Sequence, residues 1–488
     1  MTNDTTVLLG LDGLASEKVE VDQQGRPVVH LVTADGRAAR CPGCGQVSSA
    51  AKGNVTTRPR DLPHGGRGVA LMWHKRRWRC KNPGCARSSF TESLPAVPAR
   101  HRLTSRLRRA AGAAVGDRGA TVEQAGRDLG LSWPTVMAAA RTHAQRVLPK
   151  ALAAVRVLGI DEVRRGRRRW AYNPASGRWE VAVDAWHVGF VDISGGQGLL
   201  GQVEGRTREA VVGWLASQPR SWRDQVTYVA IDMSTVFASA VRQALPHATL
   251  VVDHFHVVQL ANKTLGEVRR RVTWRMRNRR GRKGDGEWQV RNLLTRNMED
   301  LSERRFARMW NTLVDLGNDG YEILAAYKAK ELLRDLLRLA RHDPSGHRIR
   351  QRLHAFYDWC AQSEIPELAR LAKTIDRWWP AIEAFLHTGV TNAKSEGVNR
   401  VAKLTARNAY GFRNPVNQRL RVRCATTRRG RGHLSRRRTG RTYPPRRTRA
   451  EQAGDPTPTK SNTRAMGTTG PQPPIAPSSD RPQRLEPG

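Results

Sequence analysis

Hydrophobic and polar residues alternate along roughly the first forty positions of the chain. Apolar positions on both sides of a Gln24-Gly25 turn predict a short β-hairpin. From about Leu103 the apolar spacing changes to i, i+3, i+4, and two further short helices are expected before Pro149. The chain should therefore begin with a strand-rich module and continue with a helical one.

A pattern of strands returns between residues 155 and 252. Strands are expected at the apolar runs 155–160, 181–183, 188–193, 226–231 and 249–252, with helices at 209–216 and 236–245. Residues 257–386 are rich in Leu, Ala, Arg and Trp and predict a helical insertion. A last helix is expected over 392–408, and a disordered basic tail from residue 428.

The composition adds a strong positive charge. The 488 residues include 84 Lys+Arg against 43 Asp+Glu, a formal net charge of +41, and an excess remains when the residues after 428 are left aside. This balance excludes an ordinary metabolic enzyme and indicates a polyanionic partner. Hydrophobic residues, at 39% of the chain, suffice for a buried core, so a wholly disordered basic protein is also excluded.

The sequence gives no indication of a membrane or secreted protein. It has no apolar run of about 18 residues, and no basic segment precedes the short apolar stretch near residue 10. Six cysteines are too few for a disulfide framework in a chain of this length. We therefore expect an intracellular protein without a membrane span.

Four of the six cysteines stand in two close pairs, each accompanied by Pro or Gly. The pairs have the spacings C-x2-C and C-x4-C and comprise Cys41, Cys44, Cys80 and Cys85. Paired thiolates in such knuckles converge on one tetrahedral ion, which suits Zn²⁺. His64 and His74 are possible substitute ligands, although a role as exposed polar residues explains them better. Cys360 and Cys424 stand alone and are expected to be packing residues.

Residues 121–143 carry the pattern of two short helices joined by a tight turn. Thr121 opens a capping box, Gly130 ends the first helix, and Ser132 is placed to cap the second. Small residues at Gly126 and Gly130 let the helices cross closely, as in a helix-turn-helix whose second helix enters the major groove of DNA. A helical hairpin that only packs against its neighbours is the alternative. The exposed candidates for base or phosphate contact are Ser132, Thr135 and Arg141.

Acidic residues follow three of the predicted strands. Asp161, Asp232 and Asp253 each close a buried apolar run, where a carboxylate is unfavourable unless it is paired or bound to a metal. A site that breaks and joins phosphodiesters needs carboxylates from several elements to hold two Mg²⁺ ions. Glu396, on the predicted helix 392–408, is the fourth candidate.

The same predicted helix carries a stripe suited to a DNA backbone. It shares the face of Glu396 and consists of Asn399, Arg400, Lys403 and Arg407. From residue chemistry alone, a surface glutamate paired with Arg400 is an equally good interpretation of Glu396. The acidic pattern by itself is therefore not specific.

Taken in order, these motifs resemble the ISL3 family of bacterial insertion-sequence transposases. After the cysteine pairs and the helix-turn-helix, the motifs are GIDE at 159–162, IDMS at 231–234, VDHFHV at 252–257, TNAKSEGVN at 391–399 and RNAYGF at 407–412. The resemblance covers about residues 1–427, and the last two motifs are its most specific part.

The resemblance implies a catalytic domain of the RNase H-like fold with a DDE triad. In that fold the first and fourth strands are adjacent and parallel, so the triad carried over is Asp161, Asp232 and Glu396, with Mg²⁺ or Mn²⁺ in the catalytic site. Asp253 is expected to support the site, or to replace Asp232 in the triad. For His254 and His256, hydrogen bonding to a catalytic group is preferred over contact with DNA. Two further acids, Asp184 and Asp192, are expected on the surface or in turns.

The implied fold is a multidomain α/β chain. Its parts are an N-terminal zinc-binding module (1–95), a helix-turn-helix DNA-binding domain (96–150), an RNase H-like catalytic domain (151–262 and 387–427) interrupted by an all-helical insertion (263–386), and a disordered basic tail (428–488). The insertion's tryptophans are expected to fill its core, and the alternative is that they shape a DNA channel or a dimer contact. They stand at positions 274, 288, 310, 378 and 379. The arginine-rich stretch 164–179 is longer than the fold needs, and we expect it to touch DNA.

The implied function is DNA transposition by metal-dependent phosphodiester hydrolysis and strand transfer. The partners would be double-stranded DNA, both the element's terminal inverted repeats and the target, and further copies of the chain in a synaptic complex. We expect a cytoplasmic, nucleoid-associated location and no membrane contact. The alternatives are a catalytically inactive DNA-binding regulator derived from a transposase, and a recombinase that uses a covalent Ser or Tyr.

Overall fold

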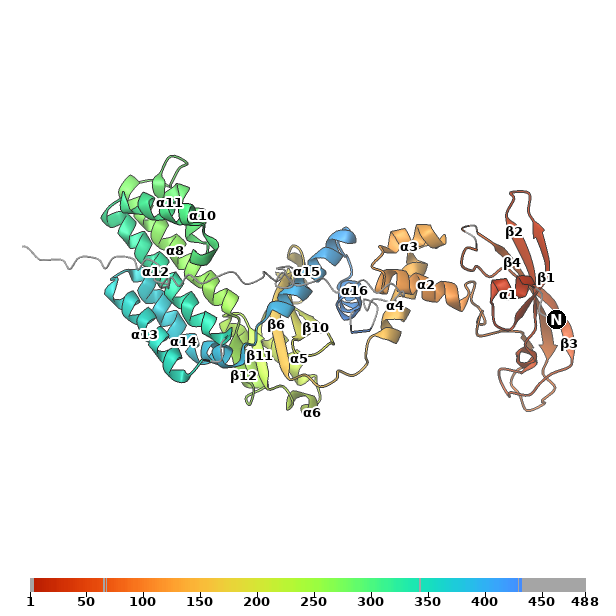
Figure 1. Cartoon of the computed structure of the whole chain (residues 1–488). Coiled ribbons are helices and arrows are strands. Elements are labelled where there is room, and N and C mark those ends of the chain that lie inside the picture. The colour runs from red at the N-terminus through yellow and green to blue at the C-terminus, as the bar shows by residue number, and fades with distance from the viewer. Residues whose placement is uncertain (1–3, 65, 67, 342–343, 429, 432–488) are drawn as a thin grey trace, which may run out of the picture. The chain divides into compact units, whose positions relative to one another are not determined.

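The computed structural model of the chain describes residues 4–64, 66, 68–341, 344–428 and 430–431. Along this part, a short helix and a set of strands come first, followed by three helices, a second set of strands with helices, a long helical stretch and two last helices (Figure 1). The predicted tail lies almost wholly outside the described residues. The described chain is a mixed α/β protein, as its sequence predicts.

A five-stranded sheet occupies the N-terminal part. Its strands run in the order β1-β2-β4-β3, with β5 paired to β4. The elements are β1 (Leu14–Val21), β2 (Pro27–Thr33), β3 (Ala51–Thr57), β4 (Ala70–Arg79), β5 (Ser89–Thr91), helix α1 (Asp4–Leu9) and the 3-10 helix η1 (Gly36–Ala39). The predicted hairpin is confirmed, because β1 and β2 pair antiparallel across a turn in which Gly25 has a φ of 71°. Leu31, Leu71 and Trp73 are buried at the centre of this sheet's core.

Three helices follow, and two of them form the predicted tight turn. They are α2 (Ser105–Gly116), α3 (Val122–Leu129) and α4 (Trp133–Val147). The Thr121 hydroxyl accepts a hydrogen bond from the Gln124 N–H at 2.9 Å, and Gly130 ends α3 in the left-handed conformation. A Cβ on Gly126 would stand 2.8 Å from the Leu131 carbonyl oxygen, so only a residue without a side chain fits there. The helix-turn-helix arrangement is thus confirmed.

A second five-stranded sheet lies in the middle of the sequence. Its order is β10-β9-β6-β11-β12, and its strands are β6 (Val157–Arg164), β9 (Trp186–Asp192), β10 (Leu199–Glu204), β11 (Tyr228–Ile231) and β12 (Thr249–Val252). β11 runs parallel to both β6 and β12, whereas β9 pairs antiparallel with β6 and with β10. The sequence pattern does not predict β10, because a glycine interrupts its short apolar run.

The predicted strand at 181–183 belongs to a different element. It ends β8 (Arg178–Val183), which pairs with β7 (Arg169–Asn173) in a separate two-stranded sheet. Its apolar residues are largely exposed, so their alternation does not mark a strand of the central sheet. The helices associated with the central sheet are α5 (Arg208–Ala216), α6 (Arg220–Arg223) and α7 (Thr235–Ala244), and they share its core. Of these, α5 and α7 confirm the two helices predicted from the sequence.

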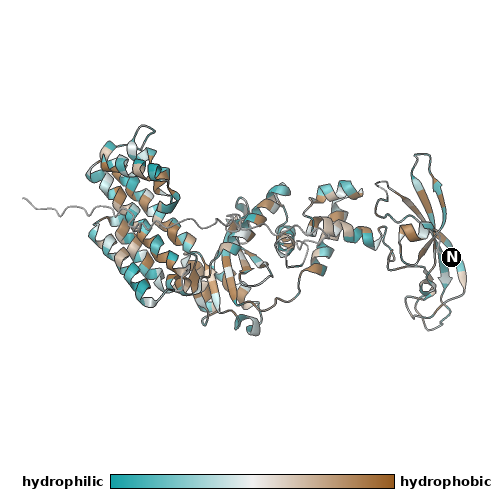
Figure 2. Cartoon of the chain, in the orientation of Figure 1, coloured by the Kyte–Doolittle hydropathy of each residue, from teal (hydrophilic) through white to brown (hydrophobic). Residues whose placement is uncertain are grey.

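Between β12 and residue 388 the described residues form helices and turns. The elements are α8 (His254–Arg277), α9 (Gly286–Gln289), α10 (Arg291–Leu294), η2 (Met298–Asp300), α11 (Glu303–Val314), α12 (Asn318–Arg338), η3 (Leu339–Arg341), α13 (Gly346–Gln362) and α14 (Pro366–Thr388). Hydrophobic and hydrophilic residues alternate around these helices (Figure 2), and their apolar faces join one core. Trp378 is buried, three of the other tryptophans are half-buried, and Trp274 is 57% exposed. The prediction that all five fill the core is therefore wrong for Trp274.

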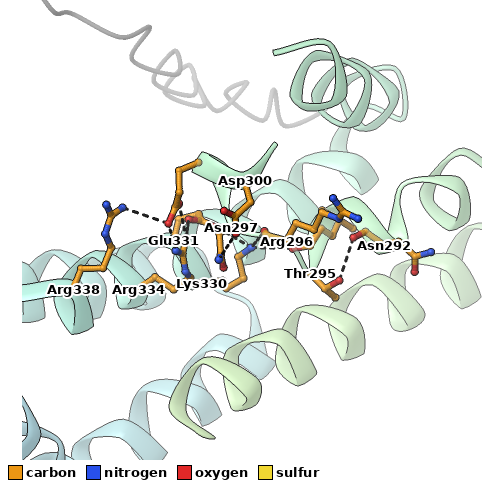
Figure 3. A network of polar contacts seen from close by, with 11 residues as sticks. Asn292, Thr295, Arg296, Asn297, Asp300, Lys330, Glu331, Arg334 and Arg338 are labelled. Atoms are coloured by element: carbon orange, nitrogen blue, oxygen red, sulfur yellow. Dashed lines mark hydrogen bonds and ion pairs between the residues drawn. The ribbon is translucent and has the colours of Figure 1, made fainter. Parts of the chain in front are cut away.

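A buried lysine ties a turn of this helical stretch to α12. Lys330 is 1% exposed, and its ammonium donates to the carbonyl oxygens of Leu294 and Arg296 (Figure 3). Next to it, Arg334 pairs with Glu299 and with Glu331. Burial lowers the pKa of Lys330, and the charge and hydrogen bond of Glu331 offset this effect in part. The buried cations Lys330 and Arg334 are thus hydrogen-bonded or paired, as charges removed from water must be.

Two helices close the described chain. α15 (Ala393–Asn408) confirms the predicted last helix, whereas α16 (Pro415–Thr427) is not predicted by the sequence pattern. Most of the residues that α16 buries are polar, so its buried face has no apolar periodicity. Cys424 on α16 and Cys360 on α13 are both 2% exposed, which confirms them as packing residues. No helix in the described part of the chain combines the length and the apolar character that a bilayer crossing requires.

Candidate active site and zinc centre

The four paired cysteines converge at one point. Cys41 Sγ lies 3.9 Å from Cys85 Sγ, Cys44 Sγ lies 3.6 Å from Cys80 Sγ, and all four sulfurs lie within 4.8 Å of one another. Sulfurs bound at about 2.3 Å around a tetrahedral zinc ion stand about 3.8 Å apart, so the arrangement fits structural Zn²⁺. The backbone N–H groups of Cys44 and Gly43 lower the pKa of Cys41 to about 6, whereas burial and the neighbouring thiols raise the pKa of Cys80 to about 12. The four sulfurs therefore oppose one another's ionisation unless a cation lies between them.

The two histidines considered as substitute ligands have other partners. His64 Nε2 lies 3.6 Å from Asp61 Oδ2 and 3.2 Å from Arg106 Nη2. His74 lies between His30 Nδ1 and the Thr56 hydroxyl, each at 2.9 Å. In the described part of the chain, the thiol cluster therefore consists of cysteines alone.

The three residues predicted to contact DNA lie on or next to α4. Ser132 precedes the helix, but its hydroxyl lies 2.8 Å from the Thr135 hydroxyl and makes no capping bond to the backbone. Ser132 is therefore the N-cap residue of α4, as predicted, but its side chain forms no capping hydrogen bond. Arg141 is exposed, and its Nε donates to Asn417 Oδ1 of α16 at 3.0 Å. DNA contact by these residues stays a prediction.

Asp161 lies inside β6 and not at its end. β6 continues to Arg164 because Trp186 at the start of β9 still pairs with it. The prediction that Asp161 closes a strand is wrong for this reason, since backbone pairing does not require the apolar run to continue. One carboxylate oxygen of Asp161 accepts from Asn399 Nδ2 at 2.8 Å, and the other accepts from the Glu162 N–H at 2.7 Å.

Asp232 and Asp253 directly follow β11 and β12, as predicted. Because these strands are parallel neighbours, their carboxyl ends lie at one edge of the sheet. Asp253 begins α8 by accepting from the Phe255 N–H at 3.2 Å. Asp232 Oδ1 is buried and has no hydrogen-bond donor among the described residues. A buried carboxylate oxygen without a donor is unfavourable unless a cation meets it, so this atom fits a metal ligand.

Helix α15 carries Glu396 to the same edge of the sheet. Asn392, just before the helix, donates from Nδ2 to the Ile160 carbonyl oxygen at 3.0 Å. Gly159 on β6 allows this approach, because a Cβ there would collide with Ser395 Oγ and stand 2.7 Å from Asn392 Oδ1. The glycine before Asp161 therefore sets how closely the helix packs on the strand.

The acids from these elements form a loose cluster, in which Asp161 and Asp232 do not belong to the group of described residues whose ligand atoms all lie within 4.8 Å of one another. Asp253, His256 and Glu396 each offer a ligand atom within 4.8 Å of the other two. Burial raises the pKa of Asp161 to about 6, and the charges of Asp232 and Glu396 add to the rise. Burial also raises the pKa of Asp232. Carboxylates that oppose one another's ionisation in this way are held most easily around a cation.

Asp253 differs from the other acids in its hydrogen bonds. Burial raises its pKa, but hydrogen bonds from His254 and from the Phe255 N–H outweigh burial, so the pKa falls below its usual range. His254 Nδ1 lies 3.2 Å from Asp253 Oδ1, and its ring stacks on Phe385 with the centroids 5.0 Å apart. His254 thus lies in ion-pair contact with an acid of the cluster, whereas His256 lies among the possible metal ligands.

Asn399 is a site residue, although its predicted role is contact with DNA. It was grouped with the basic stripe, but it is 8% exposed and donates to Asp161 Oδ2 and to the Glu162 carbonyl oxygen. The spacing from Glu396 contains the signal: if the glutamate faces the strand, a residue three positions later on the helix faces it too.

The rest of the stripe is exposed as predicted. Arg400, Lys403 and Arg407 all lie on the surface of α15. In the described part of the chain, Glu396 forms no ion pair with Arg400. The alternative interpretation, a surface glutamate paired with Arg400, is therefore wrong. The basic side chains remain available for another partner.

Asp184 lies between β8 and β9, and Asp192 ends β9 and bonds to the turn that follows it. Asp184 accepts from the Trp186 N–H at 2.8 Å, and Asp192 accepts from the N–H groups of Gly195 and Gln197. Asp192 is 1% exposed, so its turn role is confirmed while an exposed position is not.

Three family models match the chain. The DDE transposase model of the ISL3 family, described as a transposase, covers residues 158–422. A zinc-finger of transposase IS204/IS1001/IS1096/IS1165 covers residues 37–85, and the helix-turn-helix domain of transposase family ISL3 covers residues 92–144.

Individual relatives agree with the family models. The transposase for insertion sequence element IS1557 of Mycobacterium tuberculosis is 31% identical over 213 residues, which are 39% of this chain and 46% of that protein, so the match spans less than half of the relative. The transposase for IS1001 of Bordetella parapertussis is 26% identical over 423 residues, 85% of this chain and 96% of that protein. A chain of the Drosophila P element transposase strand transfer complex aligns over 67% of this chain and 92% of its own, but a TM-score of 0.36 at 10% identity is too low to support an argument. The chain belongs to the ISL3 family of transposases.

Proposed function

We propose that the chain is a DNA transposase that cuts and joins DNA with divalent metal ions at a site built from Asp161, Asp232 and Glu396. The order of the central sheet supports an RNase H-like fold for residues 151–262 and 387–427, because the strands on one side of β6 are antiparallel and those on the other side are parallel. Residues 263–386 would then be a helical insertion between the fifth strand and the last catalytic element.

The acid cluster fits Mg²⁺ or Mn²⁺. Carboxylate oxygens are the ligands that these hard ions prefer, Asp232 Oδ1 has no donor among the described residues, and burial raises the pKa values of both Asp161 and Asp232. When bound, two such ions would activate the attacking water or 3′-hydroxyl and stabilise the leaving oxygen. Asp253 and His256 lie close enough to Glu396 to share in metal binding, and Asp253 is the alternative to Asp232 in the triad.

Other residues would position this site and its substrate. Asn399 orients the Asp161 carboxylate through its hydrogen bond, and Asn392 holds α15 against β6. The exposed side chains of Arg400, Lys403 and Arg407 would hold the DNA backbone beside Glu396, because cations along one helix face contact successive phosphates. The chain thus would place a phosphodiester, rather than a small molecule, next to the acids.

The N-terminal parts would recognise the element's ends. The zinc-binding module (1–95) and the helix-turn-helix domain (96–150) would bind the terminal inverted repeats in duplex DNA. Ser132 and Thr135 at the start of α4, with Arg141 further along, are the residues proposed for base or phosphate contact. Because transposition brings two ends together, the active form would be a homo-oligomer.

The meeting of β6, the ends of β11 and β12, and α15 at one edge of the sheet, each with an acidic residue, carries this proposal. The test is Mg²⁺-dependent cleavage of a duplex that contains the element's ends, by the purified full chain. Asp161→Asn and Glu396→Gln should each reduce cleavage by more than about 100-fold. Loss of a residue that only orients a metal ligand usually reduces activity by less than this. Both variants should still bind the ends, and Glu209→Gln, an exposed acid on α5, should cleave like the wild type.

Each rival has its own outcome in the same assay. If the two acid variants cleave as well as the wild type, the assignment of the triad is wrong. A wild-type chain that binds the ends but cleaves with neither Mg²⁺ nor Mn²⁺ would be the inactive regulator. A covalent protein–DNA intermediate would identify a Ser or Tyr recombinase.

A further inference from the structure

The hairpin β7–β8 carries an exposed aromatic face. Trp170 lies opposite Val181 and Tyr172 lies opposite Trp179, so these four side chains share one face of the ribbon. Their exposed fractions are 55% for Trp170, 39% for Val181, 54% for Tyr172 and 67% for Trp179. Aromatic side chains gathered in the open on one face indicate a surface that binds something.

The same hairpin is strongly basic. Residues 164–183 contain six arginines and one glutamate. The glutamate is occupied at the tip of the hairpin, where Glu180 accepts from Asn173 Nδ2 at 3.0 Å and from the Ser176 hydroxyl at 2.6 Å. Over the described residues, no acidic side chain pairs with the arginines at 167, 169 and 178. Free cations beside flat rings are the combination that binds single-stranded nucleic acid, through phosphate contact and base stacking.

The hairpin is anchored next to the proposed active site. It starts at Arg169, shortly after β6 ends, and β6 is the strand that carries Asp161. Its tip is shaped by Gly177, with a φ of 65°, and by Asn173 Oδ1, which accepts from the Ala175 N–H. Nearly all residues from 166 to 182 are exposed, and a two-stranded ribbon without further packing is only marginally stable in water. A partner that covers the aromatic face would therefore stabilise the hairpin.

We propose that this hairpin binds unpaired nucleotides of DNA beside the active site, with bases stacked on Trp170 and Trp179 and phosphates held by the neighbouring arginines. The faces of bases are hidden inside a duplex and open only in unpaired nucleotides, so stacking selects single-stranded DNA. A second copy of the hairpin is a poorer occupant, because the two basic ribbons would repel each other. The inference rests on the proposed function in one respect: it names the form of DNA that this site would hold.

Overhang preference tests the proposal in the full chain. Fluorescence anisotropy would compare a blunt 20-base-pair duplex with the same duplex carrying a four-nucleotide single-stranded overhang. The wild type should prefer the overhang by about tenfold, since stacking of one base on one aromatic side chain accounts for about fivefold or more. The double variant Trp170→Ala/Trp179→Ala should lose this preference and bind the blunt duplex within about twofold of the wild type. Trp170→Phe/Trp179→Phe should keep most of the preference.

The matched control is Trp274→Ala, which removes an equally exposed tryptophan from α8 and should behave like the wild type. The proposal is wrong if the wild type shows no preference, or if the double alanine variant weakens both duplexes alike. It is also wrong if that variant changes the oligomeric state in sedimentation, since the face would then dock on another copy. The assay needs neither metal nor cleavage, so a chain that prefers overhangs but never cuts contradicts the proposed function alone.

Discussion

The zinc centre and the acid cluster both gather metal-binding side chains, but the chain assembles them differently. Each cysteine pair is closed by a short knuckle, so only one long-range contact is needed to bring Cys41 and Cys44 to Cys80 and Cys85. The acids come from β6, from the ends of β11 and β12, and from α15, and none of these elements is adjacent to another in sequence.

This difference decides what each site depends on. The thiols have sulfur atoms 3.6 to 3.9 Å apart and need a cation to remain together as thiolates. The acids depend on packing: Gly159 admits α15 to the strand, and Asn399 holds Asp161. The N-terminal site should therefore fail when its metal is removed, and the central site when its packing is disturbed.

Loss of zinc should have the largest effect. Cys80→Ser, or a strong chelator, should unfold the N-terminal module, because the binding free energy of a structural zinc site, about 10 kcal/mol or more, is also folding free energy. Metal analysis should fall from about one zinc per chain to near zero, with loss of binding to the element's ends. His64→Ala should leave the zinc content unchanged, and a loss there would show that a histidine is a ligand after all.

The two candidate second acids should separate in cleavage assays. Asp232→Asn should reduce cleavage by more than about 100-fold and Asp253→Asn by less, because Asp253 already accepts a hydrogen bond from the Phe255 N–H and contacts His254, whereas Asp232 Oδ1 has no donor in the described chain. Binding to the element's ends measures whether both variants are folded. The reverse ranking would place Asp253 in the triad.

Removal of the amide that holds Asp161 should have an intermediate effect. Asn399→Ala should lower cleavage by about 10- to 100-fold, the usual range for a residue that orients a metal ligand. Raised Mg²⁺ should recover part of the loss, which a purely structural defect would not allow. Asn408→Ala, at the exposed end of the same helix, serves as the control.

Crowding the contact between β6 and α15 should cost stability as well as activity. Gly159→Ala should destabilise the central domain by about 1–3 kcal/mol, because its Cβ would collide with Ser395. Thermal unfolding and cleavage should fall together. Gly166→Ala adds a methyl group where no atom lies within 4 Å and should change neither. Unchanged melting of Gly159→Ala would show that α15 does not pack as closely as described.

The exposed stripe should give the smallest effect. Lys403→Ala should weaken DNA binding several-fold and reduce the slope of log affinity against log salt by about 0.9, the loss of one phosphate contact. Leu404→Ala removes the neighbouring side chain, 55% exposed and uncharged, and should leave the slope unchanged. An unchanged slope for Lys403→Ala would remove this residue from the DNA interface.

Sequence patterns predicted the elements where apolar periodicity is strong and missed them where it is weak. The first hairpin, the helix-turn-helix, and the strands that precede Asp232 and Asp253 follow from spacing and capping residues. β10 and α16 were missed, because the first has a short interrupted apolar run and the second buries polar side chains. The apolar run at 181–183 predicted a strand of the central sheet, but it belongs to β8 of an exposed hairpin.

The sequence by itself determined the chemistry that the chain carries: four cysteines in two knuckles, acids at the ends of apolar runs, and an excess of cations for a polyanion. Only the tertiary structure decided that Asn399 faces Asp161, that Asp192 and His254 bond within the protein, and that aromatic residues of β7 and β8 stand together in the open. The physical reason is that spacing within one element fixes which side chains share its face, whereas the approach of distant elements depends on packing that no local pattern records.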